Sequence, residues 1–134
     1  MMPAVQRVEV SEAAADLLRE LVREHGPLLL HQSGGCCDGS APMCFPRGEF
    51  RIGQRDVLLG VIAGCPLFMG AEQFEYWKHT QLTIDVVKGR GSGFSLEAPR
   101  GVRFLVRSRV FEQSELDALE RVPLLRGPEA DTEF

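Results

Sequence analysis

Three cysteines that lie close together are the residues in this sequence best suited to chemistry. Cys36, Cys37 and Cys44 fall within nine positions of one another, in the segment HQSGGCCDGSAPMC that covers residues 31–44. Thiolates are soft donors that suit zinc, copper(I) and iron–sulfur centres, and three thiols in one loop could bind the same ion. We therefore predict a site at Cys36, Cys37 and Cys44 for iron, zinc or copper, or for a small iron–sulfur cluster.

A fourth ligand is needed to complete such a site, and His31 is the favoured candidate because it stands where an apolar run enters the loop. Asp38 and His79 are the alternatives. The cysteine spacing matches neither the paired cysteines of zinc ribbons nor a ferredoxin run, so it does not identify the metal. Cys65, beside Pro66 in an apolar run, is expected to be a core residue outside the site.

Two other interpretations of the loop stay open. Its cysteines could be small buried side chains with only a structural role. Alternatively, one thiol, Cys37 above all, could act as a nucleophile toward an aldehyde or a disulfide, with His31 or His79 as the base. A third hypothesis places function elsewhere: the aromatic residues of segment 74–77 either pack in the core or anchor a partner protein.

The elements that must position the loop begin with a helix. Ser11 is a suitable N-cap, apolar residues recur at helical spacing from Leu17 to Val22, and Gly26 followed by Pro27 should end the helix after His25. Residues 28–31 are predicted to form a strand that runs directly into the cysteine loop. Residues 32–48 lack periodicity and are rich in Gly, Ser and Pro, so they are predicted to form one long loop.

Short strands are predicted through most of the remaining chain. They cover residues 8–10, the pair Phe50 and Ile52, and residues 57–62, 82–87, 94–97 and 102–110. Residues 71–79 should form one or two helical turns, and Ser114 should open a short C-terminal helix with Asp117 at the capping-box position. The sequence therefore predicts a compact, β-rich α+β domain with an N-terminal helix, about seven short strands and a short C-terminal helix.

Length, composition and charge limit the classes of function. The chain has 134 residues, of which 44% are apolar and 25% charged, and its net charge is −4. These values predict a single domain over residues 1–134, with a core at about 5–121 and a loose tail at 122–134. An acidic chain has no global electrostatic reason to bind nucleic acid or acidic lipid, so neither partner is expected.

Two further features bear on location and on charge. The apolar run over residues 57–69 is interrupted by Gly and Pro and is too short to span a membrane, and residues 1–10 contain no secretion signal, so a cytoplasmic protein is expected. On the last predicted strand, Arg103, Arg107 and Arg109 share one face. These arginines are expected to be solvated or paired with acids on the neighbouring strand.

Several motifs resemble one uncharacterised bacterial family, the domain of unknown function 779. They are the cysteine loop together with residues 73–80, 84–87, 89–91, 94–97 and 103–109, and the resemblance covers about residues 5–118. It implies a functional association, because genes of this family are often found beside aldehyde and alcohol dehydrogenase genes. A neighbouring aldehyde or alcohol dehydrogenase is therefore an expected partner. The chain itself has no dinucleotide-binding fingerprint.

The order of elements also resembles the A-type iron–sulfur carriers of the HesB class over about residues 8–99, with a Gly-Gly-Cys loop at 34–36 and a Gly-Ser-Gly-Phe segment at 91–94. This resemblance implies a HesB-like fold with a small helix at each end. The carriers' Cys-Gly-Cys tail is missing, because no cysteine follows Cys65. We therefore expect a self-contained three-thiol site in an accessory protein that supports an aldehyde- or alcohol-oxidising enzyme, and we leave a homodimer open.

Overall fold

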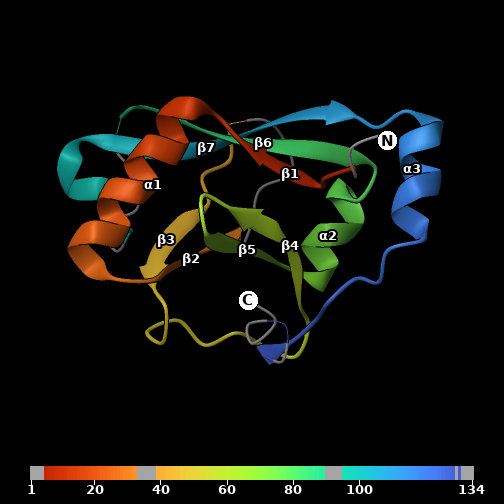
Figure 1. Ribbon diagram of the computed structural model, residues 1–134, viewed down its shortest axis with the longest axis horizontal. Helices are drawn as coiled ribbons and strands as arrows, with labels where there is room; N and C mark the ends of the chain where they lie inside the picture. The colour runs from red at the N-terminus through yellow and green to blue at the C-terminus, as the bar shows by residue number, and fades with distance from the viewer. Residues whose placement is uncertain (1–4, 33–38, 90–94, 129, 131–134) are drawn as a thin grey trace.

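The structure is a computed structural model that describes residues 5–32, 39–89, 95–128 and 130. These residues form three α-helices, one short 3-10 helix and seven strands, which confirms the α+β class (Figure 1). In chain order the elements are β1 (Val8–Val10), α1 (Glu12–His25), β2 (Leu28–Gln32), β3 (Met43–Pro46), β4 (Asp56–Ile62), β5 (Cys65–Gly70), α2 (Ala71–Trp77), β6 (Thr80–Lys88), η1 (Ala98–Arg100), β7 (Val102–Val110) and α3 (Gln113–Glu120).

The strands form two sheets. Sheet A has the order β1-β6-β7, with β1 parallel and β7 antiparallel to β6. Sheet B has the order β3-β2-β5-β4, in which only the β2–β5 pair is parallel. Figure 1 shows sheet A above sheet B, with α1 at one end of the molecule and α2 and α3 at the other. The main core contains residues from both sheets and from α1 and α2.

Helix α1 has the boundaries that the sequence predicts. The hydroxyl of Ser11 accepts a hydrogen bond from the backbone N–H of Ala14 at 3.1 Å, so the first turn is capped. Gly26 closes the helix with a φ of 80°, a conformation that glycine adopts without strain. The leucines between the caps face the core, where Leu18 and Leu21 are fully buried. The helix carries the chain directly into β2.

The predicted loop over residues 32–48 is wrong in part, because Met43–Pro46 form strand β3 and pair with β2. Phe50 and Ile52 belong to no strand; only an isolated bridge joins Arg47 to Phe50. The strand predicted for residues 94–97 is also wrong over its described part, where residues 95–97 form a bend and turn that lead into η1. Segments of three or four residues are too short for local sequence pattern to decide between a strand and a turn, so pairing with the rest of the chain decides it.

The C-terminal region differs from the prediction in two ways. Helix α3 begins at Gln113, and its capping box consists of Glu112 and Glu115 in place of Ser114 and Asp117. Part of the tail that was expected to be loose packs along β4. There the N–H of Leu58 donates to the carbonyl of Leu125 at 3.0 Å, and the N–H of Gly127 donates to that of Asp56 at 2.8 Å.

Candidate functional site

The structure describes two of the four predicted metal ligands. His31 lies on β2 and Cys44 on β3, whereas Cys36 and Cys37 lie outside the described residues, as does Asp38. The chain is described again from Gly39, which lies two residues after Cys37. The candidate site is therefore built from both ends of the loop and from what surrounds them.

His31 and Cys44 point to opposite faces of sheet B. In the β2–β3 ladder Leu30 is paired with Cys44, and His31 is paired with Met43. Directly paired residues share a face and consecutive residues alternate, so Cys44 shares the face of Leu30 and not that of His31. Leu30 and Cys44 both belong to the main core. The register therefore does not bring His31 and Cys44 together on one face, as binding of one ion would need.

On its own face His31 is held by an acid and an aromatic ring. Its Nε2 lies 3.0 Å from Oδ1 of Asp56, on β4, and its ring lies 4.7 Å from that of Phe50. The second carboxylate oxygen of Asp56 accepts a hydrogen bond from the N–H of Gly53 at 2.8 Å. The imidazole is only 6% exposed. Because Phe50 and Gly53 lie in the loop after β3, their contacts with His31 and Asp56 hold this loop against sheet B.

On the opposite face, Cys44 lies beside a buried acid. Glu97 is only 1% exposed, and it accepts hydrogen bonds from the hydroxyl of Ser95 and, at 3.4 Å, from the N–H of Phe104. Ser95 also accepts a hydrogen bond from the N–H of Cys44 at 2.8 Å, and the N–H of Leu96 donates to the carbonyl of Cys44 at 3.0 Å. We call Cys44, Ser95 and Glu97 the buried Cys–Glu cluster.

The electrostatics of the cluster are unusual for a protein interior. Burial raises the pKa of the Cys44 thiol far above its ordinary value, and the nearby Glu97 and Cys65 raise it further. Within the described part of the chain, no Lys, Arg or His forms an ion pair with Glu97. A buried carboxylate is costly unless a counter-charge or hydrogen bonds compensate it, and the two described donors to Glu97 are both neutral.

The end of the cysteine loop is fixed next to this cluster. Gly39 donates to the carbonyl of Val106 at 2.8 Å, and Val106 donates back to the carbonyl of Ser40 at 2.8 Å. Arg103 also donates to the carbonyl of Gly39 at 3.0 Å. Val106 is two residues beyond Phe104, whose N–H contacts Glu97. The described end of the loop, at Gly39 and Ser40, is therefore held beside β7.

Glu97 and Ser95 are site residues that sequence reasoning missed. Both lie in a segment where Phe94 and Leu96 alternate with them, a pattern that favours an outward-facing polar pair. The turn that leads into η1 instead turns Glu97 into the core. No feature of the sequence near Glu97 indicates this placement, since it depends on contacts with β3 and β7.

The remaining candidates lie outside the cluster. Cys65 is buried in the main core, as expected, and burial raises its pKa to about 11. His79 is exposed in the short connection between α2 and β6. Phe74 and Trp77 are buried, so the core interpretation of segment 74–77 is correct for both, while Tyr76 is exposed.

No group of three or more His, Cys, Asp or Glu side chains is arranged to hold a metal ion among the residues that the structure describes.

The three arginines of β7 are engaged on the outer face of sheet A. Arg107 donates to Asp85 on the neighbouring strand at 2.9 Å, and Arg109 donates to Glu115 at 2.7 Å. With Arg103 bound to the loop carbonyl, each arginine has a partner. The expectation that they pair with acids on the neighbouring strand is confirmed for Arg107.

Comparison with known families identifies the class of protein. A scan against protein-family models matches residues 17–110 to the family described as "Domain of unknown function (DUF779)". The chain belongs to this family. The DUF779 match extends from α1 to the end of β7, so it includes the cysteine loop and the buried Cys–Glu cluster. A search of curated proteins found no match to the DUF779 chain. These comparisons do not confirm the resemblance to HesB-class carriers.

The described helices give one further limit. None of them is both long enough and apolar enough to cross a membrane.

Proposed function

We propose that this DUF779 protein binds a metal ion, or a small iron–sulfur centre, through Cys36, Cys37 and Cys44, and that it acts as an accessory protein. The observation that carries the proposal is the buried carboxylate of Glu97 beside the Cys44 thiol, with no cationic partner in the described structure. A bound cation would supply the missing positive charge. Thiolates together with a carboxylate make a donor set that zinc or iron accepts.

The buried position of Glu97 changes the expected ligand set. Because His31 lies on the other face of sheet B, Glu97 replaces it as the fourth candidate ligand. Ser95 would orient that carboxylate through its hydroxyl, and the N–H of Phe104 would hold the second oxygen. The role of His31 is then structural, through its contact with Asp56.

The raised pKa of Cys44 sets the proton balance of binding. At neutral pH the buried thiol is protonated, whereas a metal ligand must be a thiolate, so binding releases the proton. Affinity should therefore increase with pH, by about tenfold per pH unit for each thiol that ionises on binding. Zinc titrations at pH 6.5, 7.5 and 8.5 measure this slope, and an affinity that does not change with pH would exclude Cys44 as a ligand.

The decisive experiment measures metal in the purified protein and its affinity in chelator competition. We expect anaerobically purified protein to contain metal and to compete with a chelator for zinc, iron or copper(I). Cys36→Ala, Cys37→Ala and Cys44→Ala should each lower the affinity by at least about tenfold. Two matched variants serve as controls: Cys65→Ala removes a buried thiol outside the site, and His31→Asn removes the discarded ligand. Neither control should show this tenfold loss of affinity.

Two results would contradict the proposal. The first is the absence of both bound metal and measurable affinity in the wild type. The second is a loss of affinity in Cys65→Ala as large as that in Cys44→Ala, because it would show that the substitutions act through the core. Thermal unfolding of each apo variant separates loss of fold from loss of a ligand.

The proposed client is an aldehyde- or alcohol-oxidising enzyme in the cytoplasm. The support for it is the genomic association that the family resemblance implies. Metal-loaded protein should increase the activity of the neighbouring dehydrogenase in its metal-free form, and Cys44→Ala should not. Co-purification of tagged protein with that enzyme tests the contact itself.

Thiol catalysis receives less support from the described residues. Burial raises the pKa of both Cys44 and Cys65, so neither thiol is a ready nucleophile at neutral pH. His31, the candidate base, is bound to Asp56 and lies on the face of sheet B opposite Cys44. Cys37, the nucleophile that the sequence favours, lies outside the described residues, so this alternative stays a prediction.

A further inference from the structure

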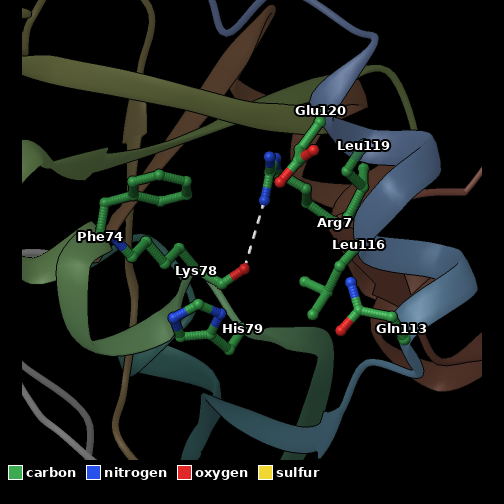
Figure 2. A pocket seen from close by; sticks show the side chains of 8 residues that line it. All are labelled: Arg7, Phe74, Lys78, His79, Gln113, Leu116, Leu119 and Glu120. Carbon is green, nitrogen blue, oxygen red and sulfur yellow. Dashed lines mark hydrogen bonds between the residues drawn. The ribbon is translucent and has the colours of Figure 1, made fainter.

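A second candidate site lies at the other end of the molecule from α1. It is a cavity of about 400 Å³ between the segment that precedes β1, the end of α2, and α3 (Figure 2). This volume is at the lower end of the range of ligand pockets, which is roughly 300–1,000 Å³. Phe74, Leu116 and Leu119 supply an apolar wall. The cavity is therefore of a size and polarity that suit a small ligand with an apolar part.

Arg7 is the cation in this cavity that lacks an acidic partner. Its guanidinium lies 5.2 Å from the centre of the Phe74 ring, and it donates a hydrogen bond to the carbonyl of Lys78 at 3.4 Å (Figure 2). Partial burial lowers the pKa of Arg7. No carboxylate forms an ion pair with it among the described residues. A guanidinium has five N–H donors, so most of them are available to a ligand.

The other charges around the cavity restrict the ligand further. Lys78 also lines the cavity, but its ammonium is paired with Glu75 at 2.7 Å, and Glu120 adds one negative charge to the lining. With one unpaired cation and one nearby carboxylate, the site favours an anion with a single charge over a phosphate dianion. The planar fork of an arginine matches a carboxylate in a two-point contact.

We propose that this cavity binds a small organic acid, a monocarboxylate whose apolar chain or ring packs against Phe74, Leu116 and Leu119 while Arg7 holds the carboxylate. None of these residues belongs to the cysteine loop or to the buried Cys–Glu cluster. The proposal is therefore independent of metal binding, and either one can fail without the other.

Calorimetric titration with octanoate tests the site, with octanamide as the neutral isostere and inorganic phosphate as the anion without an apolar part. We expect saturable binding of octanoate, with octanamide and phosphate each at least about tenfold weaker. Arg7→Gln should weaken octanoate binding by about tenfold or more, since it removes the charged donor. Arg23→Gln, which removes an exposed arginine on α1, is the matched control and should leave binding unchanged.

A second variant keeps the test informative if Arg7→Gln unfolds. Leu116 is half-buried on α3, and Leu116→Trp should fill the cavity and abolish octanoate binding while the thermal unfolding temperature is retained. Three outcomes would overturn the proposal: no saturable binding of octanoate, equal binding by wild type and Leu116→Trp, or binding of phosphate as tight as that of octanoate.

Discussion

The two sheets of this protein differ in how many of their faces are covered. All five residues of β2, in the middle of sheet B, are buried, and so are five of the six in β5. In β6, the central strand of sheet A, buried residues are interspersed with partly exposed ones. Sheet B separates the main core from a smaller cluster around Phe68, whereas the outer face of sheet A carries charged side chains. Continuous apolar strands are expected where both faces are covered.

This difference decides whether the face that a side chain occupies can be predicted from the sequence. On β6 and β7 the alternation itself shows which residues face water, so the arginines of β7 could be assigned to the outer face. On β2 every residue is buried, and the sequence does not say which core each one joins. His31 and Cys44 were grouped on their distance along the chain, but sheet B places them on opposite faces.

The matched pair Leu29 and Leu30 gives the most direct test of two buried faces. Leu30 joins the main core and Leu29 the smaller cluster, and each is at most 1% exposed. We expect Leu30→Ala to lower the free energy of unfolding by about 4 kcal/mol and Leu29→Ala by about 3 kcal/mol, because the loop over the smaller cluster can partly fill the space. Urea denaturation measures both. A cost below about 1 kcal/mol for Leu29→Ala would show that this face is only loosely covered.

The acid that holds His31 should have the next largest effect. Asp56→Ala removes the acceptor of two hydrogen bonds, one from His31 and one from Gly53. We expect a loss of about 2 to 3 kcal/mol in the free energy of unfolding. The isosteric Asp56→Asn is the control and should cost less, since its amide oxygen can still accept one bond. Equal costs for the two variants would mean that charge, and not hydrogen bonding, holds this face together.

Cys65 makes the stability of the main core depend on pH. Its folded-state pKa of about 11 lies above the ordinary value near 9, so burial favours the neutral thiol. The stabilisation is complete below pH 9 and is lost as the pH rises through 11, and about 2 kcal/mol of it has been lost at pH 11. Comparing the wild type with Cys65→Ala at pH 8 and pH 11 isolates this contribution. If both lose stability equally, the thiol is not the cause.

The outer face of sheet A should give the smallest effect. Arg107→Gln breaks the bond to Asp85 on an exposed surface. We expect the free energy of unfolding to fall by less than about 0.5 kcal/mol, because exposed ion pairs contribute little to stability. The same denaturation assay measures the change, with Leu30→Ala as the reference. A loss above about 1 kcal/mol in the free energy of unfolding would show that the outer face of sheet A contributes to stability as a buried face does.

The parts of the fold that could be predicted are those that depend on local signals. Ser11 and Gly26 define α1 because a cap is a contact between near neighbours, and β7 is identified by its own alternation. Strand β3 exists because it pairs with β2, and nothing within its four residues indicates that. Glu97 is buried by hydrogen bonds from Ser95 and from β7, so its place depends on the folded chain. The roles of Cys36 and Cys37 stay predictions.

The C-terminal segment that lies along β4 has a further consequence. β4 is the outermost strand of sheet B, and its backbone groups bond to Leu125 and Gly127. Without that segment the strand would offer unpaired N–H and C=O groups beside an apolar run, which is a template for adding a strand from another molecule. The C-terminal segment thus protects this edge from pairing with another molecule. We expect a protein shortened after residue 124 to polymerise through this edge.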